Sequence, residues 1–294
     1  MTTELALSPA DPQWHERRRK FVGASEVGLL FGVPSYGNRT LVDLWWLKKY
    51  GEERQSKGND STRLGTKLEP IVLEFAEEKL GPIGDRQLWL TNGVNGATLD
   101  GRVLASGDVV EAKTSGVLWP GAASDWGPDE SDECPDGYLL QCQTQLLVTG
   151  AEVAHLAALI GGRGFAMFHI EPQQALMDAI AAKSLEFVLS LESDEPPAEP
   201  PQMETLKRIK RQPNKVLPWS DEIAATYDEL QAAKASAKAA DDQKELIQRK
   251  LLALLGDAEA AEVSGGLVTY YQRSRKESYV AASTYRQLGF QKGK

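Results

Sequence analysis

The sequence is poor in cysteine and has no long apolar run, and these shortages exclude several classes of protein. None of its 294 residues belongs to a run approaching the ~20 apolar residues that span a bilayer. The polar N-terminus lacks the apolar core of a signal peptide. Its two cysteines, Cys134 and Cys142, are too few for a four-cysteine iron–sulfur site and suit a reducing compartment. We therefore expect a cytoplasmic protein without structural disulfides.

Positive charge is also scarce, since the formal net charge is −9. A chain with this balance binds nucleic acid only through a local basic path. Three segments offer one: Arg17–Lys20, residues 207–211 together with Lys215, and the tail from Arg273 to Lys294. The competing interpretation of each segment is ordinary solvated surface.

The segment ATLDGRVLASGDVVEAKT, residues 97–114, is the most informative part of the chain. If residues 108–114 form a strand, Glu111 and Lys113 point to the same face, and the preceding valines make it a core strand. Asp100 lies on the preceding run, beside a glycine that can turn the backbone. Two converging carboxylates hold a hard cation such as Mg²⁺, and a nearby lysine can orient or deprotonate water. This predicts a metal-dependent phosphodiesterase; the alternative is a chance pair of surface charges.

The spacing of apolar residues and the positions of turn-forming residues predict helices and strands in the first two thirds of the chain. We expect helices at 23–31, 40–50, 61–80, 137–149 and 173–192, and strands at 86–91, 97–104, 108–114, 152–160 and 164–171. This order predicts an α/β fold with a mixed sheet flanked by helices. The loop 115–136, rich in Gly, Pro and Asp, follows the Glu-x-Lys strand, where a substrate-contacting or gating segment would lie.

Individual helices carry further expectations. In helix 61–80 one apolar face is predicted, made of Leu64, Leu68, Ile71, Val72 and Phe75. Glu69 lies beside that face and can reach inward. In helix 137–149, Tyr138 and Gln141 are one turn apart and both can face the site. Trp45 and Trp46 are interpreted as core residues rather than base-stacking platforms.

The composition changes near residue 193. Residues 193–201 (SDEPPAEPP) read as an extended linker, and the predicted domains are 1–192, a linker 193–216, and 217–294. The last contains a long helix at about 220–255, with Ser220 as N-cap and Gly256 after its end. Its alanine-rich polar middle is expected to cross solvent or pair loosely with another helix, whereas its apolar ends could pack. A hairpin at Gly265-Gly266 and a basic tail, which touches DNA or stays disordered, close the chain.

Five short motifs stand in order within residues 12–192. They are Trp14-His15 with an arginine cluster and Gly23-Ala24-Ser25-Glu26; Gly65-Thr66-Lys67-Leu68-Glu69; Leu99-Asp100-Gly101; the spacing Asp-x10-Glu-x-Lys; and Tyr138-Leu139-Leu140-Gln141-Cys142-Gln143, running on to Val148-Thr149-Gly150. Together they resemble the phage lambda exonuclease and YqaJ-type viral recombinase family of PD-(D/E)xK nucleases. The last third of the chain matches no part of that pattern.

The resemblance implies a restriction-endonuclease-like core and Mg²⁺-dependent hydrolysis of DNA, with Mn²⁺ able to substitute. It implies metal ligation by Asp100, Glu111 and the Ala112 carbonyl, with Glu69 as an outer ligand. Lys113 would position or activate water. Gln141 would support that lysine or contact phosphate.

The resemblance also implies contacts to the ends of duplex DNA. Arg18 and Ser25, seven residues apart, would bind a 5′ phosphate, with Arg17 and Arg19 as alternative registers, and Tyr138 and Gln143 would contact DNA. The implied enzyme digests one strand from 5′ to 3′ and leaves a 3′ overhang for a single-strand annealing protein. It would work as a homotrimer in a bacterial host if phage encoded. The alternatives are a structure-specific endonuclease of the same fold and a non-catalytic DNA-binding or scaffolding protein.

Overall fold

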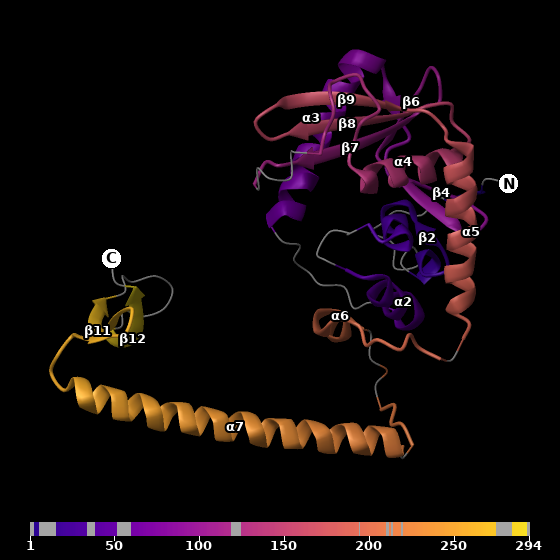
Figure 1. Ribbon diagram of the computed structural model, residues 1–294. Coiled ribbons are helices and arrows are strands. Elements are labelled where there is room, and N and C mark those ends of the chain that lie inside the picture. Colours follow the sequence, from indigo (N-terminus) through magenta and orange to yellow (C-terminus); the bar gives the residue numbers. More distant parts are fainter. Residues whose placement is uncertain are drawn as a thin grey trace. The chain divides into compact units, whose positions relative to one another are not determined.

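The computed structural model describes residues 3–5, 16–33, 39–51, 60–118, 125–193, 195–209, 212, 214–218, 220–274 and 284–292. The chain divides into two compact units, Met1–Gln212 and Pro213–Lys294 (Figure 1). Within the described residues, no helix combines the length and the apolar character needed to cross a bilayer.

A five-stranded mixed sheet organises the first unit (Figure 1). Its order is β3 (Ile83–Gly84), β6 (Gly101–Val103), β7 (Val109–Ser115), β8 (Ala154–Ile160) and β9 (Gly164–Ile170). β7 and β8 are parallel, and the other neighbours are antiparallel. Helix α3 (Asp60–Leu80) packs on one face and α4 (Asp136–Thr149) on the other. The predicted mixed α/β architecture is confirmed.

The predicted strand 97–104 is in fact two strands that belong to different sheets. β5 (Asn95–Leu99) joins a second sheet with β1 (Thr3–Leu5), β4 (Leu88–Asn92) and β2 (Val22–Gly23), whereas β6 joins the five-stranded sheet. Asp100 lies at the break. Gly101 allows the chain to pass from one sheet to the other here, because the Cβ of any other residue would lie 2.3 Å from Ile83 Cγ2. The apolar alternation continues through the break, so the pattern alone could not reveal it.

The buried face of α3 also differs from the prediction. Val72, Leu73 and Ala76 are buried against the sheet, whereas Ile71 and Phe75 are 42% and 41% exposed. The predicted Leu64 and Leu68 are half-buried. The physical reason is that only a narrow stripe of α3 side chains contacts β7 and β8. Phe75 lies at the margin of this contact, beside Phe165 of β9.

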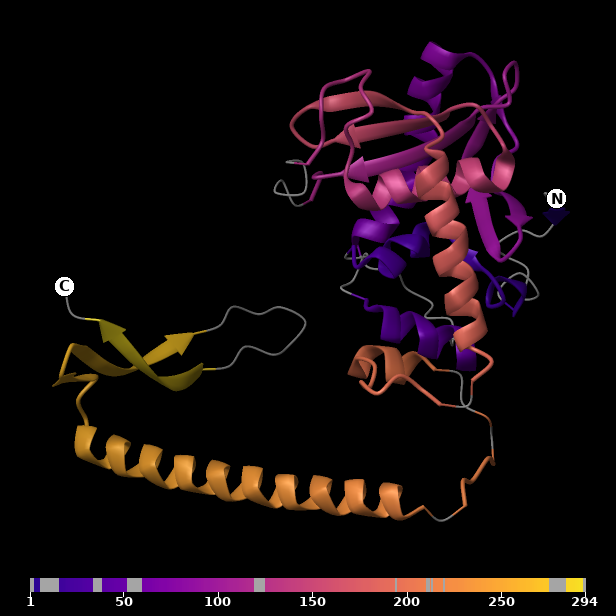
Figure 2. The same cartoon turned by 45° about the vertical axis from the view of Figure 1, so that its right-hand side comes forward.

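Three further helices complete the described core of the first unit. The 3₁₀ helix η1 (Ala24–Phe31), α2 (Leu41–Tyr50) and α5 (Gln174–Ser190) pack around α4 or around one another (Figure 2). The Thr40 side chain caps α2. Trp45 is 4% exposed and donates to the Ser190 carbonyl, so its assignment to the core is confirmed; Trp46 is half-buried.

The predicted linker contains a short helix, α6 (Met203–Arg208), that packs on α2. The Asp43 carboxylate accepts a hydrogen bond from Gln202 N at 2.8 Å, and Thr205 and Ile209 are buried. The segment predicted to be extended, 193–201, precedes this helix, and residues 203–209 of the predicted linker 193–216 pack on the first unit. Residues 210 and 211 of the predicted basic run lie outside the described residues.

The described part of the loop after β7, residues 125–135, is fixed to strand β9. The Glu130 amide donates to the Met167 carbonyl, the His169 amide donates to the Ser131 carbonyl, and Asp129 accepts from the Met167 amide. These bonds pair the free edge of β9. Residues 119–124 of the predicted gating segment lie outside the described residues.

The second unit consists of one long helix and a small sheet. Helix α7 (Asp221–Leu255) begins at Ser220, whose side chain accepts from Ile223 N, and ends before Gly256, as predicted. Strands β10 (Ala260–Val263) and β11 (Gly266–Ser274) form the predicted hairpin, and β12 (Thr284–Lys292) pairs with β11. The basic tail therefore contributes a strand over residues 284–292.

We expect Gly101→Ala to destabilise the first unit by about 1–3 kcal/mol, because the new methyl group would overlap the branched side chain of Ile83. The matched control is Gly137→Ala in α4, where a Cβ would meet only Val33 Cγ1 at 3.7 Å. Because alanine favours a helix over glycine, this control should be neutral or stabilising. Chemical denaturation measures both, and equal stabilities would contradict the steric role of Gly101.

Candidate active site

The centre of the site is the pair Glu111 and Lys113 on β7. They point to one face, as the strand period requires. Glu111 is 1% exposed, although it is charged, and Lys113 Nζ contacts its Oε1 directly. Burial lowers the pKa of Lys113, but the charges of Glu111 and Asp100 more than offset this effect and raise it overall. Lys113 therefore stays cationic at neutral pH.

Helix α4 supplies the remaining partners of Glu111. Gln141 Nε2 donates to Oε1 and Gln145 Nε2 donates to Oε2, both at 2.5 Å. Tyr138 lies one turn earlier, with Lys113 Nζ 5.5 Å from the centre of its ring. Residues 138, 141 and 145 form one stripe of the helix because of its 3.6-residue period. The prediction that Tyr138 and Gln141 face the site agrees with this geometry.

Asp100 reaches the same place from the break between the two sheets. The described pairing of β6 with β7 covers only Val109 and Val110 of β7. The next amide on that edge, Ala112 N, donates instead to Asp100 Oδ2 at 3.0 Å. The Asp100 carboxylate thus replaces a backbone acceptor where the hydrogen bonds between β6 and β7 end. Burial and the charge of Glu111 raise the pKa of Asp100 to about 8.

Glu69 approaches from α3, the helix on the other face of the sheet. Its Oε1 accepts from Gln87 Nε2 at 3.1 Å. Burial and the charge of Glu111 raise its pKa, while Lys113 acts in the opposite direction. Glu69 therefore belongs to the same electrostatic group as Glu111, as the sequence predicted.

The donor set suits a hard cation. Three carboxyl groups, those of Glu69, Asp100 and Glu111, lie around one ammonium group, and burial together with the charge of Glu111 raises the pKa of Asp100. All the side-chain donors are oxygens, which suits Mg²⁺ or Mn²⁺. Among the described residues, no three His, Cys, Asp or Glu side chains converge on one point. Mg²⁺ does not require this, since it often binds one or two carboxylates and keeps several waters.

A second polar cluster joins the N-terminal arginines to η1. Arg18 Nη2 lies 3.4 Å from Ser25 Oγ, so the fold brings together the two residues predicted to bind a terminal phosphate. Arg19 has another role: its guanidinium donates to the carbonyls of Lys48 and Lys49 at the end of α2. Arg17 is exposed. The structure thus favours Arg18 over its neighbours. Trp14 and His15 lie outside the described residues.

The sequence analysis gave no role to Glu26, although it stands in the first motif, and did not single out Lys48. Glu26 forms ion pairs with Lys48 at 2.6 Å and with Arg18 at 3.6 Å. Its carboxylate also accepts a hydrogen bond from the backbone amide of Gly23. Burial raises the pKa of Glu26, but the two cations outweigh it and lower the pKa to about 2. This carboxylate therefore holds Arg18 in place. Lys48 is distant in sequence, and no local pattern reveals the pairing.

The prediction that Gln143 contacts DNA is wrong. Gln143 is completely buried, donates to the Glu171 carbonyl and accepts from Gln173 N, so it anchors the start of α5. It lies on another face of α4 from Gln141. Gln145, which the sequence analysis did not single out, holds Glu111 instead. Its place one turn beyond Gln141 was the signal that could have found it.

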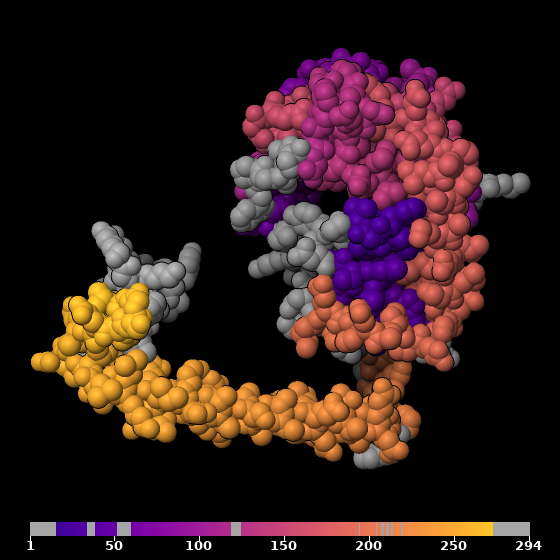
Figure 3. Space-filling view, viewed as in Figure 1, coloured from indigo at the N-terminus to yellow at the C-terminus, as the bar shows by residue number. Residues whose placement is uncertain are grey.

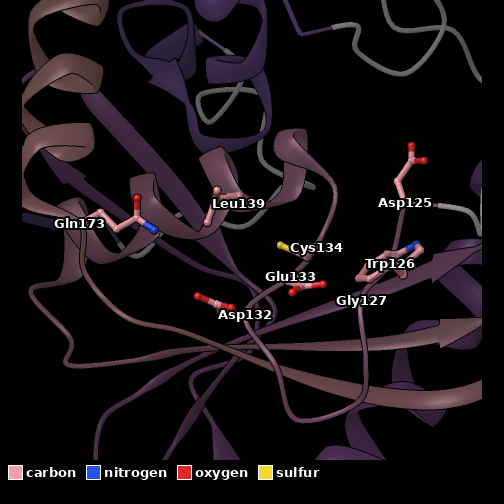
Figure 4. A pocket seen from close by; sticks show the side chains of 8 residues that line it. All are labelled: Asp125, Trp126, Gly127, Asp132, Glu133, Cys134, Leu139 and Gln173. Carbon is pink, nitrogen blue, oxygen red and sulfur yellow. The ribbon is translucent and has the colours of Figure 1, made fainter.

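A separate cavity of about 470 Å³ opens beside α4 and the 125–135 loop (Figure 4). Its walls carry three carboxylates, those of Asp125, Asp132 and Glu133, together with Trp126 and Cys134. This acidic lining is unsuited to phosphate. None of the carboxylates around Lys113 lines it.

Comparisons with known proteins agree with the motifs. A family model described as YqaJ-like viral recombinase domain matches residues 13–152. The uncharacterized protein YqaJ of Bacillus subtilis (strain 168) is 29% identical over 182 residues, covering 60% of this chain and 54% of that protein. The match thus spans about half the length of this relative.

Two solved structures show a weaker similarity. An alkaline exonuclease from Laribacter hongkongensis, LHK-Exo, is 20% identical with a TM-score of 0.46, and the match covers 62% of this chain and 93% of that one. A phage-related exonuclease from Haemophilus somnus 129PT is 14% identical with a TM-score of 0.45, covering 58% and 94%.

The matched segment contains the whole carboxylate group, Lys113, the α4 stripe and the Arg18 cluster. The resemblance found in the motifs is confirmed: residues 13–152 of this chain match the model of the YqaJ-like viral recombinase domain.

Proposed function

We propose that this protein is a Mg²⁺-dependent DNA exonuclease of a phage-type recombination system. The observation that carries the proposal is the buried meeting of Glu111, Asp100 and Lys113 at the edge of β7. A structural role does not explain it, because burying several carboxylates beside one lysine is costly. The viral recombinase domain over residues 13–152 supports the same conclusion.

In this proposal Asp100, Glu111, the Ala112 carbonyl and Glu69 hold the cation, and Mn²⁺ can substitute. The bound ion would lower the pKa of a water molecule and stabilise negative charge on the phosphate. Gln141 and Gln145 keep the Glu111 carboxylate in one orientation. Lys113, cationic beside Glu111, orients the attacking water and offsets charge that develops on phosphorus oxygens. Tyr138 lies against Lys113, where it can border the DNA.

We further propose that Arg18 and Ser25 bind the 5′ phosphate of a linear duplex. An arginine–phosphate contact is charge-assisted and two-pronged, and Glu26 fixes the guanidinium that makes it. Digestion would run from 5′ to 3′ and leave a 3′ overhang for a single-strand annealing protein, with a trimer as the working form.

The first prediction concerns the chemistry. Lys113→Met, which keeps the volume and removes the charge, should lower the cleavage rate of end-labelled linear duplex by about 10² to 10³. The matched control is Lys79→Met, because Lys79 also contacts two carboxylates, Asp129 and Glu130, but beside β9. Similar rates for the two variants would remove Lys113 from the catalytic group. Closed circular duplex serves as a second substrate, and its equal cleavage would identify an endonuclease.

The second prediction concerns the cation. Glu111→Gln removes a charge while keeping the side chain's shape, so titration calorimetry should show much weaker Mn²⁺ binding. Gln145→Leu, which frees the carboxylate on one side, should weaken binding by about 10 to 100-fold.

Glu74→Gln, an exposed change on α3, is the control and should leave Mn²⁺ binding unchanged. If Glu111→Gln binds Mn²⁺ like the wild type, the ion site lies elsewhere and the proposed ligand set is wrong.

The third prediction concerns the DNA end. Wild-type protein should degrade 5′-phosphorylated duplex faster than 5′-hydroxyl duplex, and Arg18→Ala should abolish that preference. Arg17→Ala, at the exposed neighbour, should retain it. Initial rates of the three proteins on both substrates decide the matter. Equal losses on both ends in Arg18→Ala would instead indicate a general contact to the DNA backbone.

A further inference from the structure

Helix α7 exposes an apolar row that its own unit does not cover. The helix has 35 residues, about 50 Å in length, and among them Leu255 alone is buried. Ile223, Leu230, Ile247 and Leu254 are 53%, 50%, 56% and 85% exposed. In the space-filling view the yellow residues that follow α7 lie at one end of the helix, and most of the visible face of the helix is uncovered (Figure 3).

The row follows the spacing of a coiled coil. Its members alternate in steps of three and four residues through five heptads: Ile223, Thr226, Leu230, Ala233, Ala237, Ala240, Lys244, Ile247, Leu251 and Leu254. A repeat of 3.5 residues keeps one seam against a partner helix of the same kind. The alanines at the centre allow two helices to approach closely.

We propose that α7 pairs with α7 of a second copy of this chain as an antiparallel coiled coil. The seam is self-complementary in that direction, because large and small residues meet in regular layers. Ile223 meets Leu254 of the other copy, Leu230 meets Ile247, and Ala237 meets Ala240. Lys244, the one charged seam residue, meets Ala233 and already directs its ammonium group to Asp241 of its own helix.

The charges beside the seam are complementary in the antiparallel direction. In that arrangement Glu229 lies beside Lys250 of the other copy, and Lys234 lies beside Asp241, and each pair occurs twice by symmetry. In a parallel pair the two copies of Lys244 would face each other in the seam. Charged residues flanking a seam set the orientation of a coiled coil mainly by penalising the wrong one.

The mass of the full-length protein, measured by sedimentation equilibrium at several concentrations, tests the proposal. Leu230→Lys should halve the mass of the wild-type assembly, whatever further association the first unit makes. Leu246→Lys is a closely matched control, because Leu246 is also 50% exposed but lies off the seam. A wild-type protein whose mass both variants leave unchanged would overturn the proposal, and so would equal loss in the two variants.

Charge reversal tests the direction. Glu229→Lys and Lys250→Glu, made singly, should each raise the dissociation constant of the pair about tenfold, since two contacts change from attraction to repulsion. The double variant should return to the wild-type value. Failure of the double variant to recover, together with no effect of Lys250→Glu alone, would indicate a parallel pair and overturn the antiparallel assignment. Nuclease activity does not enter either readout.

Discussion

A carboxylate in the middle of a sheet is costly unless each of its oxygens has a donor, and the candidate active site depends on how Glu111 meets this requirement. Two glutamines of α4 and the ammonium of Lys113 surround it. These contacts fix the position of α4 on the sheet as much as they fix Glu111. Helix α4 therefore both packs in the core and orients the proposed metal ligand. The packing of the core in this way fixes the orientation of the Glu111 carboxylate.

The second constraint is the passage of the chain from one sheet to the other at Asp100. Because β5 and β6 belong to different sheets, the edge of β7 loses its backbone partner just where Ala112 N needs one. The Asp100 carboxylate takes that position. The same turn thus ends a hydrogen-bond ladder and brings a second carboxyl group beside Glu111, where a cation is proposed to bind.

The two units differ in how far they bury their apolar side chains. The first unit buries its apolar residues in three clusters around its sheets, and even part of the predicted linker packs there as α6. The long helix of the second unit has a polar, alanine-rich middle, and its own unit leaves its apolar row exposed. The residues proposed to carry nuclease chemistry all lie in the first unit. In the pairing proposed above, the second unit joins two copies of the chain through α7.

The sequence alone determined the resemblance to YqaJ-like viral recombinase domains, the order of most helices and strands, and the grouping of Asp100, Glu111, Lys113 and Glu69. These conclusions depend on local spacing: two residues apart on a strand, or one turn apart on a helix. Only the tertiary structure decided what depends on distant contacts. In the structure the predicted strand 97–104 is two strands that meet at Asp100, and Ile71 of α3 is exposed. Gln145, rather than Gln143, contacts the Glu111 carboxylate. The tertiary structure also brought Arg18, one of three adjacent arginines, to Ser25 and Glu26, in a cluster with Lys48 that no local repeat specifies.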